Sequence, residues 1–140
     1  QGHQGNQHQE IVDLITSSNI ELRKEDPDID RYFQSIRVLI LPSLLEGCPN
    51  VLFEALLRKR ICIISTGANS DNFITDGVNG FVYDGTDEGL LDSFEKVFKI
   101  LGTATEANII ETGYNYATTN FSIDAMINKY EQLFLSIHES

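Results

Sequence analysis

The sequence is poor in basic residues. Lys and Arg together number 10 against 21 Asp and Glu, which gives a formal net charge of -11 over 140 residues. A chain with this balance repels a polyphosphate backbone, because binding to nucleic acid depends on cationic side chains that neutralise phosphates. We therefore expect no nucleic acid partner.

The sequence is also poor in cysteine. Cys48 and Cys62 are the only two, and they have neither paired nor metal-ligand spacing. The histidines, His3, His8 and His138, lie near the ends of the sequence and also lack such spacing. These absences argue against a metal site, and the cysteine usage favours a reduced, cytoplasmic setting.

Long apolar runs are missing as well. A membrane-spanning helix needs about 18 consecutive apolar residues or more, and every apolar run in this sequence is far shorter. We therefore expect no transmembrane segment. Hydrophobic residues nevertheless make up 41% of the chain, and 140 residues are close to the roughly 150 of an average domain, so one domain with a real core is expected.

The most informative part of the sequence lies between residues 37 and 64. Two continuous apolar runs, residues 38–41 and 61–64, enclose a predicted helix over residues 49–60. Continuous rather than alternating apolar residues are typical of strands buried on both faces, as in parallel sheets. The pattern predicts an α/β fold with a mostly parallel sheet, and ligands of such sheets bind at the carboxyl ends of the strands, where Glu46 follows.

The rest of the chain follows the same alternation of elements. A glycine- and glutamine-rich tail or truncated loop over residues 1–9 opens the chain and indicates a fragment of a longer protein, with one domain over residues 10–140. In the first half of the chain we predict a helix at 10–17, a strand at 20–23 and a helix at 31–35 capped by Asp30. After the second apolar run we predict a brief helix at 71–74, a turn at 76–80 whose Asn79-Gly80 pair tolerates positive φ, and a strand at 81–83. The remaining predicted helices are at 87–101, stopped by Gly102, at 105–118, and at 122–137, capped by Ser122.

The start of the predicted helix at 49–60 is a candidate anion site. Proline is favoured at the first helical position, and Cys48 before it is a poor capping residue. The amides of Asn50, Val51 and Leu52 would then be free to hold a diphosphate at the positive end of the helix dipole. Alternatively, Asn50 caps the helix itself, which would shift its start and weaken this prediction.

Two glutamates flank this helix start, and each has two interpretations. Glu54 is either a solvated residue paired with Arg58, worth about 0.3 kcal/mol, or an acceptor for the two hydroxyls of a ribose. Glu46 is either an ordinary acid in a surface loop or an acceptor for sugar hydroxyls. Each glutamate alone is weak evidence for a site.

Three linked segments together resemble a known family. EGCPNVLFEAL at residues 46–56, preceded by LPS at 41–43, resembles the E-x7-E segment of retaining, nucleotide-sugar-dependent glycosyltransferases of the GT-B fold, the group 1 or family 4 enzymes. DGVNGFV at 76–82 is similar to a downstream segment of that family, and residues 121–130 are similar to its C-terminal helix. The resemblance extends from about residue 28 to the end of the chain.

The resemblance implies a three-layer, Rossmann-like domain that forms the C-terminal, donor-binding half of a GT-B enzyme. It implies transfer of a hexosyl group from a nucleoside diphosphate sugar with retention of configuration, with Glu46 as the catalytic candidate at the donor sugar and Glu54 at the ribose. The donor-binding residues that it implies are Glu46, Gly47, Cys48, Pro49, Asn50, Val51 and Glu54, with Gly67 and Asn69 as weaker candidates.

The resemblance also implies what the chain lacks. Family members generally need no metal or other cofactor, because an Arg/Lys pair neutralises the leaving diphosphate. That pair, and the N-terminal domain that binds a saccharide or lipid-linked acceptor, would precede residue 1. We therefore expect little or no activity from the chain alone, and a parent protein that is cytoplasmic or attached peripherally to a membrane. The alternative is a non-catalytic nucleotide-recognition or interaction domain of the same fold.

The chain departs from the family pattern at Lys59, where glycine is common. Either the helix end closes differently, or Lys59 adopts a left-handed conformation. Arg58, Lys59 and Arg60 would lie about 12 Å along the helix from its phosphate end, which makes them poor substitutes for the missing pair.

Overall fold

The computed structural model describes residues 28–138. The chain divides into two compact units, residues 1–32 and residues 33–140, and the packing below concerns the second. The expected tail at 1–9, helix at 10–17 and strand at 20–23 lie outside the described residues. The predicted domain boundary after residue 9 lies there too and stays a prediction.

The described strands form one parallel sheet. β1 (Val38–Leu41), β2 (Ile61–Ser65) and β3 (Phe81–Tyr83) lie in the order β1-β2-β3, with Val38 opposite Ile61 and Ile63 opposite Phe81. Every residue of the central strand β2 is buried. The continuous apolar runs therefore predicted parallel strands correctly, because both faces of the central strand are covered.

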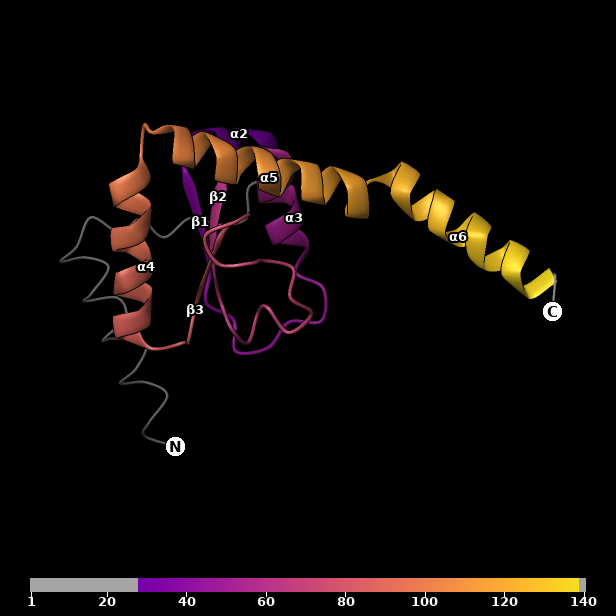
Figure 1. Ribbon diagram of the computed structural model, residues 1–140, viewed down its shortest axis with the longest axis horizontal. Coiled ribbons are helices and arrows are strands. Elements are labelled where there is room, and N and C mark those ends of the chain that lie inside the picture. Colours follow the sequence, from indigo (N-terminus) through magenta and orange to yellow (C-terminus); the bar gives the residue numbers. More distant parts are fainter. Residues whose placement is uncertain (1–27, 139–140) are drawn as a thin grey trace. The chain divides into compact units, whose positions relative to one another are not determined.

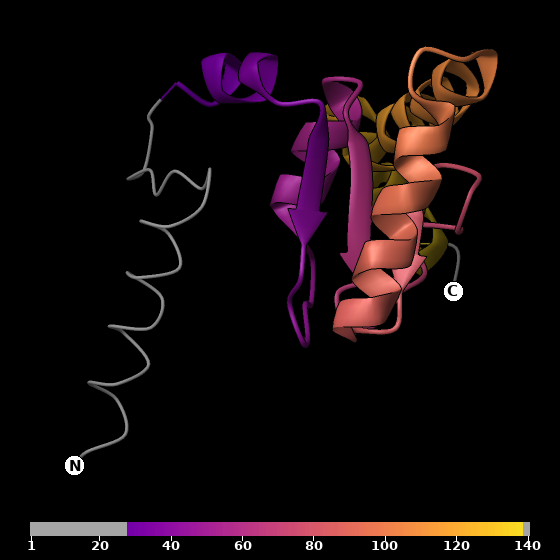
Figure 2. The same ribbon diagram turned by 90° about the vertical axis from the view of Figure 1, so that its left-hand side faces the viewer.

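Helices cover both faces of the sheet. Figure 2 shows α4 (Asp87–Ile100) in front of the sheet and α3 (Asn50–Leu57) behind it. On the α4 face the core contains Ile61, Ile63, Phe81, Tyr83, Val97 and Ile109. Successive side chains of a strand point to opposite faces, so Cys62 and Ile64 face α3 and its buried Leu52, Phe53 and Leu56. The predicted α/β, three-layer, Rossmann-like architecture is confirmed.

α5 (Ala104–Phe121) runs past the amino ends of the strands and packs on α3 (Figure 1). Gly113 lies at the crossing, where a Cβ would come within 2.8 Å of a Leu56 methyl and 3.0 Å of the Asn79 carbonyl oxygen. Glu106 fixes the start of the helix: its carboxylate accepts from Arg37 Nε at 2.9 Å, Arg37 Nη2 at 2.7 Å and the Gly102 amide at 2.6 Å.

The chain enters β1 through α2 (Ile29–Ser35). Its start differs from the prediction: the Arg31 amide donates to Asp28 Oδ1 at 3.0 Å, so Asp28 caps the helix. Asp30, which was expected as the cap, lies within the first turn. Both aspartates suit a helix start, and the sequence pattern alone does not decide which of two neighbouring acids takes the cap position.

The segment between β2 and β3 contains two further corrections. Residues 71–74 form no helix, because Asn72 adopts a φ of 54° and the Asn69 side chain binds both the amide and the carbonyl of Ile74. The positive φ of the following turn falls on Gly77, at 72°, and not on the Asn79-Gly80 pair. Asn79 instead uses its side-chain amide, which accepts from the Thr75 amide and donates to the Phe73 carbonyl.

The C-terminal helices begin and end largely as predicted. Gly102 follows α4 with a φ of 77°, and Ser122 caps α6 (Ile123–His138) by accepting from the Ala125 amide at 3.1 Å. Phe98 follows Phe94 by four residues on α4, a spacing that favours a shared apolar side, yet it is 67% exposed. Large apolar side chains recur along one side of α6, yet they are 45–73% exposed, since α6 packs mainly against the end of α5.

Within the part of the chain that the structure describes, no helix combines the length and apolar character that crossing a bilayer requires.

Candidate functional site

Three loops and two helix starts meet at the carboxyl edge of the sheet. Residues 42–49 follow β1, residues 66–70 begin the segment that follows β2, and residues 84–86 follow β3, while α3 and α4 begin at the same edge (Figures 1 and 2). This is the edge at which parallel sheets bind ligands. α5 and the cations near residue 59 lie at the opposite edge.

The first turn of α3 is uncapped. Pro49 occupies the cap position, Asn50 is the first helical residue, and no side chain accepts a hydrogen bond from the first amides. The helix therefore begins one residue later than predicted, and the alternative in which Asn50 caps it is wrong. The Leu52 amide, expected to be free, instead donates to the Pro49 carbonyl at 2.9 Å. Among the described residues the amides of Asn50 and Val51 have no such acceptor, and they lie with the positive end of the helix dipole at the edge of the sheet, as an anion site requires.

α3 ends at Leu57, which is earlier than the predicted end at Arg60. Lys59 adopts a left-handed conformation with a φ of 58°, one of the two outcomes expected when glycine is absent there. Its Nζ lies 2.7 Å from Glu111 Oε2 and 4.7 Å from the centre of the Tyr114 ring. This cation is therefore engaged with α5, at the far end of α3 from the uncapped turn.

Glu54 lies one turn into α3 and is half-buried. Arg58 does not pair with its carboxylate: Arg58 Nη1 donates to the backbone carbonyl of Glu54 at 3.0 Å, and the guanidinium lies 5.2 Å from the centre of the Phe33 ring. Within residues 28–138 no ion pair reaches the Glu54 carboxylate, so the interpretation as a surface pair with Arg58 is wrong.

Glu46 is half-buried in the loop after β1. Its backbone carbonyl accepts from Ser70 Oγ at 3.0 Å, and among the described residues its carboxylate has no ion-pair partner. Two carboxylates without partners thus flank the uncapped helix start. Carboxylates in this state are available to accept hydrogen bonds from the hydroxyl groups of a ligand.

The residues between the two glutamates complete the edge. Gly47, Cys48 and Asn50 are exposed, Val51 is half-buried, and Pro49 is buried beneath them. Their backbone is therefore accessible where the helix begins. Burial raises the pKa of the other cysteine, Cys62, far above its ordinary value, so that thiol stays protonated in the core.

Gly67 and Asn69 lie in the adjoining loop but are engaged within the protein. A Cβ at Gly67 would overlap the Leu44 carbonyl oxygen, so only glycine allows the loops after β1 and β2 to come this close. Both polar atoms of the Asn69 side chain bind the backbone of Ile74. The structure gives these two residues a part in shaping the loops, and direct contact with a ligand stays a prediction for both.

Two serines that hold the loop after β1, Ser65 and Ser70, were not identified as site residues from the sequence. The buried Ser65 hydroxyl donates to the Ser43 carbonyl and accepts from the Ala68 amide, and Ser70 binds the Glu46 carbonyl. The available signal was their position: Ser65 ends β2 and Ser70 lies in the loop that follows, which lies beside the loop after β1 in a parallel sheet.

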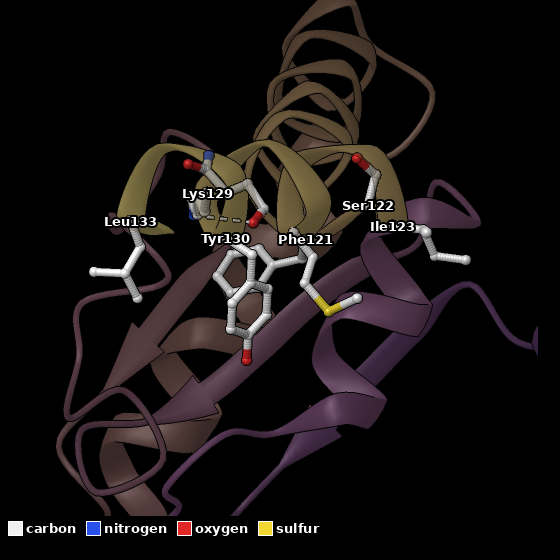
Figure 3. Close-up of a pocket in the computed structure, with 8 residues that line it drawn as sticks. Phe121, Ser122, Ile123, Lys129, Tyr130 and Leu133 are labelled. Carbon is white, nitrogen blue, oxygen red and sulfur yellow. Dashed lines mark hydrogen bonds between the residues drawn. The ribbon is translucent and has the colours of Figure 1, made fainter. Parts of the chain in front are cut away.

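A hollow of about 460 Å³ lies elsewhere, where α5 meets α6 (Figure 3). Phe121, Tyr130 and Leu133 line it, and Lys129 Nζ donates to the Asn120 carbonyl at its rim at 3.2 Å. Its lining is almost entirely apolar, and it lies in a different place from the glutamates and the free amides. Over the described residues, no group of three His, Cys, Asp or Glu side chains could hold a metal ion.

Comparison with known proteins gives a consistent assignment. Residues 2–99 match the model of a family described as glycosyl transferases group 1. The chain is 30% identical over 115 residues to the Vi polysaccharide biosynthesis protein VipC/TviE of Salmonella typhi, an alignment that covers 78% of this chain and 19% of that protein.

Two solved structures share the fold. A glycosyltransferase from Rickettsia africae ESF-5 superposes with a TM-score of 0.83 at 22% identity, over 99% of this chain and 38% of that one. HepE of Anabaena in complex with UDP gives 0.80 at 18% identity, over 94% and 36%. The chain thus spans about a fifth of its curated relative and well under half of each solved structure.

Proposed function

This chain belongs to the group 1 glycosyl transferases, and from that membership we propose that it is the donor-binding part of a retaining hexosyltransferase of family 4. Its α/β domain has the fold of the C-terminal, Rossmann-like domains of GT-B glycosyltransferases. The parent enzyme would transfer a sugar from a nucleoside diphosphate sugar to a saccharide or lipid-linked acceptor.

The uncapped start of α3 between two unpaired carboxylates is the observation that carries the proposal. The donor diphosphate binds the free amides of Asn50 and Val51, Glu54 accepts from the ribose hydroxyls, and Glu46 accepts from hydroxyls of the sugar. Glu54 follows Asn50 by four residues, or about 6 Å along the helix, which fits the step from a diphosphate to its ribose. HepE structures that contain UDP and UDP-glucose support a nucleotide sugar as the donor.

The charges that assist departure of the diphosphate come from elsewhere in the parent enzyme. Arg58 and Lys59 are held at the far end of α3 by Phe33, Glu111 and Tyr114. The cations expected upstream, together with a separate acceptor domain, would complete the site. The absence of a metal or other cofactor stays a prediction, as does a cytoplasmic or membrane-peripheral parent protein.

Calorimetry tests the nucleotide site. We expect the chain to bind at least one of UDP, GDP and ADP, and Glu54→Ala to weaken that binding about 10- to 100-fold, because hydrogen bonds from the ribose to a charged acceptor are lost. Glu95→Ala is the matched control: it removes the same charge from an exposed position on α4 and should leave affinity unchanged.

If no nucleotide binds, or if Glu54→Ala and Glu95→Ala behave alike, the ribose role is wrong and a non-catalytic interaction domain becomes the better interpretation. Retention is tested separately on the parent enzyme by the anomeric configuration of its product in NMR spectra. A product of inverted configuration would contradict the family 4 assignment.

A further inference from the structure

The loop after β2 holds the loop that carries Glu46. β1 and β2 are parallel neighbours, with Leu41 opposite Ile64, so both loops leave the sheet side by side. Beyond the last residues paired between β1 and β2, contacts continue from Ser65 at the end of β2, and from the loop after it, to the loop after β1. They involve three carbonyls of the loop after β1, those of Ser43, Leu44 and Glu46.

Each of these carbonyls has its own contact. The buried Ser65 hydroxyl donates to the Ser43 carbonyl and is itself fixed by the Ala68 amide, 3.0 Å away. Gly67 lies directly against the Leu44 carbonyl, with no room for a side chain. Ser70 Oγ then donates to the Glu46 carbonyl at 3.0 Å.

The last contact differs from the others in one respect. Ser65 and Gly67 are built into the fold, since one is buried and the other cannot bear a Cβ. Ser70 is exposed, and its hydroxyl binds the backbone carbonyl of Glu46, the residue assigned above to the donor sugar. An exposed hydroxyl contributes little to folding, so its contact bears mainly on where Glu46 lies.

We propose that Ser70 is a positioning residue: its hydroxyl fixes the backbone of Glu46, and so sets how well the Glu46 carboxylate receives the sugar of the donor. The inference rests on the proposed function, because it assigns Glu46 to the sugar. The nucleotide half of the donor is held by α3 and does not depend on Ser70. Loss of the hydroxyl therefore weakens recognition of the sugar and leaves recognition of the nucleotide intact.

The first test needs no ligand. In amide hydrogen exchange of the full chain, Ser70→Ala should raise exchange at residues 45–47 about 2- to 10-fold, as expected for loss of one hydrogen bond, and Ser70→Thr should restore it. Ser136→Ala is the control, because it also removes a hydroxyl bound to a backbone carbonyl, on α6. Unchanged exchange in Ser70→Ala overturns the proposal.

The second test separates sugar from nucleotide. Calorimetry compares UDP with UDP-glucose, GDP with GDP-mannose and ADP with ADP-glucose. Ser70→Ala should reduce the gain in affinity due to the sugar about 2- to 10-fold, leave the affinity for the nucleotide alone unchanged, and have no further effect in a Glu46→Ala background. An equal loss for nucleotide and nucleotide sugar, or a loss that persists without Glu46, overturns the positioning role.

Together the two tests distinguish failure of the proposed function from failure of the role inferred for Ser70. If exchange responds as expected but the unaltered chain binds no nucleotide or nucleotide sugar, the proposed function is wrong and Ser70 only anchors a loop. If nucleotide binding depends on Glu54 but the affinity gained from the sugar is insensitive to Ser70, the proposed function stands and this inference falls.

Discussion

Lys59 shows how a single residue closes α3 at a conformational cost. The Arg60 amide donates to the Ala55 carbonyl and the Lys59 amide to the Leu56 carbonyl, each at 3.0 Å, which is the hydrogen-bond pattern of a Schellman motif. The residue at its turning point normally is glycine, but here a lysine holds a φ of 58°. The contacts with Glu111 and Tyr114 offset part of the strain.

This arrangement gives a prediction about stability. Lys59→Ala keeps the strained φ and loses both contacts, whereas Lys59→Gly loses the contacts but relieves the strain. We therefore expect the glycine variant to melt roughly 3–6 °C above the alanine variant. Thermal unfolding followed by circular dichroism checks this order. An alanine variant as stable as the glycine variant would mean that the backbone at residue 59 relaxes out of the left-handed region.

At the scale of the residue, the sequence predicted positions better than partners. Glu46 and Glu54 lie at the expected edge, because continuous apolar strands fix where the loops emerge. The partner of Arg58 was wrong, because the guanidinium reaches the Phe33 ring and a backbone carbonyl instead of the nearby carboxylate. Spacing along a helix identifies neighbours but not which of several acceptors a long side chain takes.

Among the elements, α5 is joined to the amino end of β1 by Glu106. Hydrogen bonds from the Arg37 side chain, and then from the Gly102 amide, hold the pKa of this carboxyl below its ordinary value. A carboxyl with a lowered pKa in the folded state stabilises the protein at pH values above its unfolded pKa, and this contribution is lost as pH falls through the folded pKa.

The prediction is therefore a pH-dependent difference. At about pH 7, Glu106→Gln should lower the free energy of unfolding by about 1–2 kcal/mol, because charge-assisted hydrogen bonds become neutral ones. The difference from the unaltered chain should shrink as pH falls below the ordinary range of glutamate and through the lowered pKa of Glu106, because the native glutamate then becomes protonated as well. Urea denaturation across this range measures it. A difference that stays constant with pH would show that lost packing, and not lost charge, causes the effect.

Elements with strong periodic patterns were correctly predicted as helix or strand, whereas their end residues were predicted less accurately. β1, β2, β3 and α4 are where the pattern places them, since strand burial and helix spacing are local signals. The helix at 71–74 is absent because the Asn69 side chain replaces helical hydrogen bonds with its own. Asparagine side chains in turns often bind backbone groups that a helix would otherwise pair. Whether Asn69 does so depends on how the chain continues into β3, which the local sequence pattern does not show.

At the scale of the whole molecule, burial ends with α5. Ile109 and Ala117 of α5 are 3% and 0% exposed, whereas none of the side chains over residues 123–137 of α6 is buried. The core of the described domain is therefore complete without α6.

A pair of truncations tests this division. A chain that ends at Ser122 should melt within a few degrees of the full chain and keep its nucleotide affinity, because little apolar surface becomes exposed. A chain that ends at Thr103 loses the α5 residues of the core and should not fold cooperatively. Circular dichroism melts of both truncations decide the matter, and loss of cooperative melting in the longer one would contradict the assignment of the core.

The whole-molecule prediction of a three-layer parallel domain succeeded because it depends only on the alternation of apolar strands and amphipathic helices. Exposure of the apolar side of α6 was not predictable, since the sequence pattern of that helix is the same whether or not the side is covered. The pattern indicates which residues prefer burial, and only the arrangement of the elements determines which of them are buried.

The bond between Arg37 and Glu106 also bears on the order of folding. It joins residues 69 positions apart, whereas the paired strands follow one another closely along the chain. Contacts between distant residues form late because a long loop must close first. We expect Glu106→Gln to accelerate unfolding while leaving the refolding rate nearly unchanged, as stopped-flow measurements would show, so that α5 acts as a late clamp that governs how long the folded domain survives.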